Sequence, residues 1–250
     1  MKRRAEPTTP RPVSPPAAIG LGFAIAAMIG AIAGALGPRL GWWDFDVAVL
    51  VVRWSAYAGV PAAVLCLLGM LHARRGRRGM GHAALGLILL IAMLALPVYW
   101  RFVERDLPPI HDITTDTLEP PDFWVAPNSR MYGGAAIAAM QRRAYPDIAP
   151  LVLAVPVGEA FDQALRVVRE NGWEVLDAER DEGRIEATDT TFWFGFKDDI
   201  VVRVSANGAG SRVDVRSASR FGGGGDGGAN ANRIRAFLGA IEERLRGARE

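Results

Sequence analysis

The 250-residue sequence predicts a membrane α-helical protein, with three transmembrane helices, joined to an α+β two-layer sandwich in which two helices cover one face of an antiparallel sheet. Three apolar runs of eighteen to twenty residues, all before residue 103, predict the membrane part. Alternating strand-like and helix-like periodicities after residue 150 predict the sandwich. The chain has room for both, since one domain usually needs about 100–200 residues.

Four parts follow one another along the chain. Residues 1–16 contain five prolines and are predicted to be a disordered cytoplasmic tail. Residues 17–103 form the predicted three-helix transmembrane region. Residues 104–150 form a proline-rich connector, expected to lie extended on the surface of the domain that follows. Residues 151–250 form that extracytoplasmic α+β domain.

The three apolar runs are long enough to span a bilayer as helices. Ala17 to Leu36 and Gly81 to Trp100 are twenty residues each, and Trp54 to Leu71 is eighteen. A hydrocarbon core about 30 Å thick needs about 20 helical residues, so each run qualifies. A cleaved signal peptide is disfavoured, because its apolar region would be shorter and two further runs follow.

Small residues in the first run predict a close helix contact. Gly30 and Gly34 are four apart and therefore lie on one face of a helix, where they let another helix approach. The expected neighbour is the protein's own second or third span. Dimerisation through this face is the alternative.

Basic residues predict the orientation of the spans and the location of the protein. Residues 1–106 carry a net charge of +7 and residues 107–250 one of −5, so the pI of about 9.0 belongs to the first part and does not indicate nucleic-acid binding. The positive-inside rule places the two basic segments in the cytoplasm of a bacterium and the C-terminal domain in the periplasm, with the spans in the inner membrane. These segments contain Lys2, Arg3, Arg4, Arg11, Arg74, Arg75, Arg77 and Arg78.

Hydrophobic periodicity predicts the elements of the domain in the order strand, helix, four strands, helix. The first helix opens at Pro156 and stops at Asn171, and the second carries an apolar stripe that includes Phe237. Residues from about Asp147 onward are expected to contain every strand and to form a single core. The predicted strands cover residues 151–155, 173–177, 184–194, 200–204 and 212–219.

Six sequence motifs occur together in an order that is specific to one family. They are Pro108–Asp116, Ala144–Ile148, Gly183–Thr188, Phe194–Asp199, Asp214–Arg220 and Asn230–Ile234. Over about residues 107–246 the chain resembles the domain of unknown function 1499 family of uncharacterised bacterial membrane-anchored proteins. The resemblance implies no activity, because that family has none established that would carry over.

The first candidate site surrounds the glycine-rich loop from Phe221 to Gly228. Glycines before a helix N-terminus expose backbone amides that can hold an anion, and nearby arginines add positive charge. Arg216 and Arg220 are expected on the same face of a strand, and Arg233, in the first turn of a helix, needs a compensating anion. The alternative is a mobile loop followed by a helix that Asn230 caps. The candidate residues are Arg216, Ser217, Ser219, Arg220, Asp226, Asn230 and Arg233.

The second candidate site combines a histidine with several carboxylates, a set suited to acid–base chemistry. Asp and Thr side chains also cap turns, which is the structural interpretation of the same residues. No metal site is predicted, because no second histidine follows residue 111 and the single cysteine, Cys66, lies in an apolar run. No nucleotide cofactor is predicted either, since no phosphate-binding glycine motif is present. The candidate residues are His111, Asp112, Asp116, Asp189, Asp198 and Asp199.

The sequence therefore favours a membrane-anchored periplasmic binding or interaction module, with a role in envelope maintenance, over an enzyme. Its predicted partners are the lipid bilayer and another envelope protein or an anionic envelope ligand. The alternative is a periplasmic hydrolase that uses His111 and the nearby carboxylates. The aromatic run Phe192-Trp193-Phe194 is expected to pack in the core or rest on the bilayer surface, with a ligand groove as the alternative.

Overall fold

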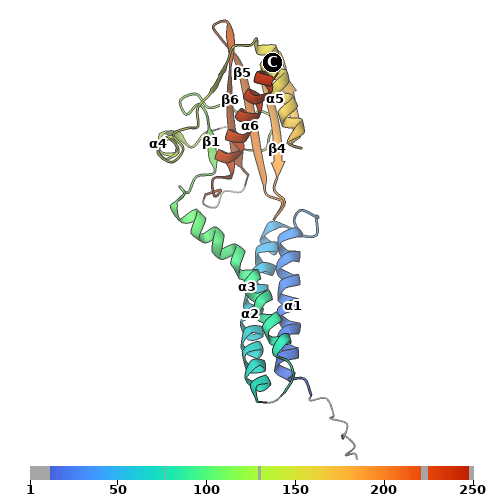
Figure 1. Ribbon diagram of the computed structural model, residues 1–250. Helices are drawn as coiled ribbons and strands as arrows, with labels where there is room; N and C mark the ends of the chain where they lie inside the picture. The colour runs from blue at the N-terminus through green and yellow to red at the C-terminus, as the bar shows by residue number, and fades with distance from the viewer. Residues whose placement is uncertain (1–11, 76, 129–130, 221–224, 248–250) are drawn as a thin grey trace, which may run out of the picture. The chain divides into compact units, whose positions relative to one another are not determined.

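A computed structural model describes residues 12–75, 77–128, 131–220 and 225–247 of the chain. The chain divides into two compact units, Met1–Arg101 and Phe102–Glu250. The first unit is helical and the second combines a sheet with helices (Figure 1). The predicted combination of three apolar helices with an antiparallel α+β domain is confirmed.

The first unit contains α1 (Pro15–Leu36), α2 (Phe45–Arg74) and all but the last two residues of α3 (Met80–Val103). Each is long and apolar enough to cross a membrane, and the three therefore are candidate spans. The helices extend beyond the apolar runs, most clearly at α2, which begins nine residues before Trp54. Polar residues at helix ends are compatible with a span because they reach the interfacial region.

Small residues let α1 and α2 approach closely, as the sequence predicts. A Cβ added at Gly30 would clash with Ser55 Oγ, and one at Gly34 would lie 2.7 Å from Val52 Cγ2. The stripe on α1 therefore packs against α2, the second candidate span of the same chain. Cys66 is fully buried, and a Cβ on Gly86 of α3 would approach its sulfur to 2.5 Å.

The start of α1 lies beside the connection between α2 and α3. Ser14 N donates to Arg78 O at 2.8 Å, and Arg78 N donates to Pro12 O at 3.3 Å. The basic residues of that connection and the start of the first span are therefore at the same end of the helical unit.

The second unit is built on one antiparallel sheet in the order β1-β6-β5-β4-β3, with β2 also paired to β6. β1 pairs with the end of β6 and β2 with its beginning, so β6 is the strand that joins the most segments. The strands are β1 (Asp112–Thr114), β2 (Leu151–Leu153), β3 (Glu174–Glu179), β4 (Arg184–Thr190), β5 (Lys197–Asn207) and β6 (Gly210–Ser219).

One face of the sheet, the helix face, is covered by α5 (Val157–Glu170) and α6 (Ala229–Gly247) (Figure 1). Apolar residues at alternate positions of β4, β5 and β6 point to this face, because side chains alternate along a strand. They form the main core with the apolar stripes of the two helices. Phe237 of α6 lies in that core and stacks on Trp173, with 5.5 Å between ring centroids.

Phe237→Ala is expected to lower the free energy of unfolding by about 3–5 kcal/mol, because it removes a fully buried ring and leaves a cavity. The measurement is denaturant unfolding of the full chain in detergent, followed by near-ultraviolet circular dichroism. Glu243→Ala, at an exposed position of the same helix, is the control and should change the value by less than about 0.5 kcal/mol. Equal effects of the two substitutions would contradict the orientation of α6.

The opposite face of the sheet is covered by residues 115–128, here called the arm. Phe123 of the arm is fully buried and forms a small second core with Ala126, Val201 and Ala218. The helix α4 (Gly134–Ala144) follows, and its Gln141 Nε2 donates to Thr114 O at 2.6 Å. We call this side of the sheet the arm face.

Two expectations about these segments are corrected. The segment 104–150 is more than a surface connector, because it supplies β1 to the sheet, so the residues from Asp147 onward do not contain every strand. The strand predicted over residues 184–194 ends at Thr190, because the chain turns after it and Phe194 has a φ of 62°.

Candidate functional site

The arm face carries many charged side chains, and the arm lies over them. Alternate residues of β4, β5 and β6 point to this face, where an uncovered sheet would present them to water. Here most are buried or half-buried, and most form an ion pair with a neighbour. The residues of the three strands that form ion pairs on this face are Arg184, Glu186, Asp199, Arg203, Arg212, Asp214 and Arg216.

The carboxylate of Glu186, which is fully buried, holds the backbone of the arm. Its Oε1 accepts a hydrogen bond from Trp124 N at 2.7 Å, and its Oε2 accepts from Val125 N at 2.9 Å and from Ala126 N at 2.8 Å. Arg184 Nη1 also donates to Oε1, at 2.9 Å. One buried charge is thus neutralised by an arginine and three backbone dipoles.

Arg216, from the first candidate site, is fully buried and binds Asp112, from the second. Its Nε and Nη2 each donate at 2.9 Å to one carboxylate oxygen of Asp112, and its Nη1 donates to Pro121 O at 3.1 Å. The ring centroid of Phe123 lies 4.8 Å from the guanidinium carbon. This bidentate ion pair connects the last part of β6 to β1 and to the arm.

Asp116 and Asp214 share two arginines near the start of the arm. Arg212 Nη2 donates to Asp116 Oδ2 at 2.7 Å and to Asp214 Oδ1 at 2.9 Å. Arg203 Nη2 lies 3.4 Å from Asp116 Oδ2 and 3.2 Å from Asp214 Oδ2. The hydroxyl of Thr115 also donates to Asp214, at 3.3 Å. Asp116 therefore ties the arm to two neighbouring strands.

Asp116 is expected to make the stability of the folded state depend on pH in the acidic range. Burial raises its pKa, but the backbone N–H groups of Glu119 and Leu118 and the guanidiniums of Arg212 and Arg203 lower it, and its pKa lies below the ordinary value. A carboxyl group with a lowered pKa in the folded state stabilises the fold above its unfolded pKa, about 3.9, and this contribution is lost as the pH falls through the folded pKa.

The melting temperature of the full chain in detergent should therefore fall more steeply below about pH 4 than that of Asp116→Asn. Asp122→Asn, an exposed position of the same arm, is the control and should follow the unmodified protein. Parallel curves for the unmodified protein and Asp116→Asn would contradict this assignment.

Arg220 binds Asp199 on the same face of the sheet. Its Nε donates to Oδ2 at 2.8 Å and its Nη2 to Oδ1 at 2.7 Å. Thr188 Oγ1 donates to the same Oδ1 at 2.7 Å. The hydrogen bond with Asp199 raises the pKa of Arg220 above its ordinary value, although burial lowers it. Arg216 and Arg220 lie on one face of the sheet, as their spacing predicts.

Arg233 lies on the helix face, so the sheet separates it from the other two arginines. Its Nε and Nη2 donate to Asp189 Oδ2 at 3.1 and 2.9 Å, and its Nη2 donates to Asp198 Oδ2 at 2.6 Å. The anion that its position in the first turn of α6 requires is supplied by these two carboxylates of the second candidate site. Its Nη1 donates to Asn230 Oδ1 at 2.6 Å and to Ser217 Oγ at 3.1 Å.

The start of α6 is capped by Asp226 rather than by Asn230. The carboxylate of Asp226 accepts hydrogen bonds from Gly228 N and Asn230 N, both at 2.8 Å. The side chain of Asn230, which is fully buried, donates instead to His111 O and to Ser219 Oγ, both at 3.0 Å. Residues 221–224 of the predicted anion-binding loop lie outside the described residues.

His111 does not join the carboxylates with which the sequence groups it. Within the described residues, its buried Nδ1 has no hydrogen-bond partner, while Asp189 and Asp198 bind Arg233. The described part of the chain contains no group of three or more His, Cys, Asp or Glu residues placed to hold a metal ion. Arginines of the first candidate site thus bind carboxylates of the second. These ion pairs form two separate networks, one on each face of the sheet.

Exposed apolar residues of the arm are a feature that the sequence analysis missed. Trp124 is 59% exposed and Val125 is 54% exposed, whereas Phe123 beside them is buried. The guanidinium of Arg184 lies 5.9 Å from the ring centroid of Trp124. The only signal in the sequence is an aromatic and apolar triplet inside a proline-rich segment.

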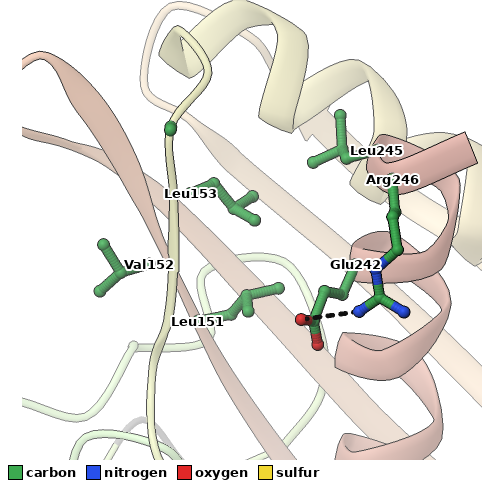
Figure 2. Close-up of a pocket in the computed structure, with 7 residues that line it drawn as sticks. Leu151, Val152, Leu153, Glu242, Leu245 and Arg246 are labelled. Atoms are coloured by element: carbon green, nitrogen blue, oxygen red, sulfur yellow. Dashed lines mark hydrogen bonds and ion pairs between the residues drawn. The ribbon is translucent and has the colours of Figure 1, made fainter. Parts of the chain in front are cut away.

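A groove of about 350 Å³ lies between β2 and the end of α6. Figure 2 shows Leu151 and Leu153 pointing toward α6, and Val152 pointing away from it. Glu242 and Arg246 form an ion pair of 3.2 Å beside the groove. The residues that line it belong to neither candidate site.

The region of the chain that matches a known protein family contains both ion-pair networks. A family model described as "Protein of unknown function (DUF1499)" matches residues 112–241, from the first residue of β1 to the second half of α6. A search of curated proteins finds no match. The matched region includes the arm as well as the whole sheet.

Proposed function

Because the chain belongs to the DUF1499 family of proteins of unknown function, we propose its function from its own residues: it is a membrane-anchored protein whose α+β unit binds another protein of the cell envelope. We place it in the inner membrane of a bacterium, with the N-terminus in the cytoplasm and the α+β unit in the periplasm. A role in envelope maintenance is consistent with that location.

The proposed orientation is supported by positive charge at one end of the helical unit. Arg74, Arg75, Arg77 and Arg78 lie at the connection between α2 and α3, which is hydrogen-bonded to the start of α1. Arginines and lysines in short loops stay on the cytoplasmic side. A reporter that is active only in the periplasm, fused after Glu250, should be active, and a well-expressed but silent fusion would contradict the orientation.

The observation that carries the binding proposal is the exposure of Trp124 and Val125 on a fixed backbone. Their N–H groups bind the buried carboxylate of Glu186, while their side chains face solvent. Such a segment loses little conformational entropy when a partner covers it, and tryptophan is a frequent anchor of protein interfaces. The backbone is therefore already ordered for an apolar contact.

Catalysis receives less support from the same geometry. Asp189 and Asp198 both bind Arg233, and Asp112 binds Arg216, so these carboxylates already neutralise buried arginines. A general acid or base needs an oxygen that can reach a substrate proton. Breaking these ion pairs would leave unpaired buried charges, which is costly.

The proposal is tested by photo-crosslinking in intact membranes. A photoreactive phenylalanine analogue in place of Val125 of the full chain should give a discrete crosslinked protein, and Trp124→Ala in the same chain should reduce its yield at least about fivefold. The analogue in place of Val152, which is exposed on β2, is the matched control and should not give that product. The same product from both positions, or a yield unaffected by Trp124→Ala, would overturn the proposal.

A further inference from the structure

The turn between β4 and β5, residues 191–196, exposes two aromatic side chains; we call it the aromatic turn. Phe192 is 61% exposed and Trp193 is 44% exposed. Their rings contact each other edge to face, with 5.1 Å between centroids. Large apolar residues exposed together on a folded domain commonly mark a contact surface.

Hydrogen bonds and backbone conformation hold this turn in one shape. Thr191 N donates to Phe196 O at 2.8 Å, and the hydroxyl of Thr191 accepts from Phe196 N at 2.9 Å and donates to Trp193 O at 2.8 Å. Phe194 has a φ of 62°, a left-handed conformation that is rare for a bulky residue. Such strain persists only where surrounding contacts fix it, and it is frequent at functional positions.

The aromatic turn lies at the end of the sheet where the chain arrives from α3. Thr190 and Lys197 flank the turn, and Arg220 N donates to Lys197 O at 3.0 Å. The neighbouring Ser219 N donates to His111 O, also at 3.0 Å. Only residues 104–111 separate the end of α3 from β1, and eight residues reach at most about 28 Å. This end of the sheet is therefore the one that the chain enters directly after a candidate span.

We propose that the aromatic turn contacts the lipid–water interface of the bilayer that α3 is suited to cross. Tryptophan and phenylalanine rings partition to the level of the lipid headgroups, and Lys197, exposed beside the turn, can pair with anionic headgroups. The contact is independent of the protein partner proposed for the arm, because it uses other residues.

The test uses an environment-sensitive fluorophore on a single introduced cysteine in the full chain. Phe192→Cys carries the probe at the turn, and Val152→Cys carries it at an exposed position near the opposite end of the sheet. Cys66 is fully buried, so the unmodified protein gives the labelling background. Both variants are reconstituted into vesicles of phosphatidylethanolamine and phosphatidylglycerol that contain a lipid with a spin label near its headgroup.

The spin-labelled lipid should quench the probe at residue 192 at least about twofold more than the probe at residue 152. Trp193→Asp, added to the Phe192→Cys variant, should bring the quenching close to the value at residue 152, because a charge at the turn opposes insertion. Equal quenching at the two positions would overturn the proposal. A probe at residue 192 that is shielded from water without lipid quenching would also overturn it and would indicate a protein contact. Neither result affects the crosslink at Val125, so the two proposals fail separately.

Discussion

Glu186→Ala is expected to lower the free energy of unfolding of the α+β unit by about 3–5 kcal/mol. The substitution removes the acceptor for three backbone N–H groups of the arm and the buried partner of Arg184. Buried donors that lose their acceptor retain their full desolvation cost, which makes the effect large. The measurement is denaturant unfolding of the full chain in detergent, followed by near-ultraviolet circular dichroism.

Glu182→Ala is the matched control, because Glu182 is an exposed residue that binds the same Arg184 at 3.1 Å. It should cost less than about 1 kcal/mol. Hydrogen exchange at residues 124–126 should accelerate in Glu186→Ala and stay unchanged in Glu182→Ala. If the two substitutions have equal effects, the carboxylate of Glu186 does not hold the arm.

A fragment that starts at Asp147 is expected to lack a cooperative unfolding transition, whereas one that starts at Phe102 should unfold cooperatively. The shorter fragment loses β1, Asp112 and the whole arm, so Arg216 loses its carboxylate partner and Glu186 loses the three backbone N–H groups of the arm and keeps Arg184. It also uncovers Val201 and Ala218, which pack against Phe123. The loss of an edge strand, of a bidentate ion pair and of the second core together approaches the whole stability of a small domain, which is about 5–15 kcal/mol.

The two fragments are compared by calorimetry and by the dispersion of their amide resonances. The longer fragment is the control for solubility and for removal of the spans. A cooperative transition of the shorter fragment at the same temperature as the longer one would show that the arm contributes nothing to folding.

The three spans, the two long helices of the domain and most strands could be predicted from the sequence because each has a strong local signal. An uncharged run of twenty residues such as Ala17 to Leu36 has few alternatives to a membrane helix. The apolar stripe that predicts α6 and the turn residues that precede β6 are sequence signals of the same local kind. β1 could not be predicted from the sequence. Its three residues, which come shortly after two prolines, are too few to show a periodicity. They form a strand only because they pair with β6, about 100 residues later in the chain.

The arm face was missed for a different physical reason. Arg212, Asp214 and Arg216 alternate with apolar residues along β6, and this pattern normally indicates a face open to water. Only the tertiary structure shows that the arm covers it. The partners of the candidate residues were not predictable either: Arg233 binds Asp189 across 44 residues, and Arg216 binds Asp112 across 104.

The long sequence separation between Asp112 and Arg216 has a consequence for biosynthesis. Asp112 is added to the chain 104 residues before Arg216, so at roughly 5–20 residues per second β1 and the arm that follows it wait about 5–20 s for β6. Throughout that interval Phe123 has no core to enter. The unit can complete its fold only after β6 and α6 have been made, so its earlier segments are exposed to aggregation until α6 has been added.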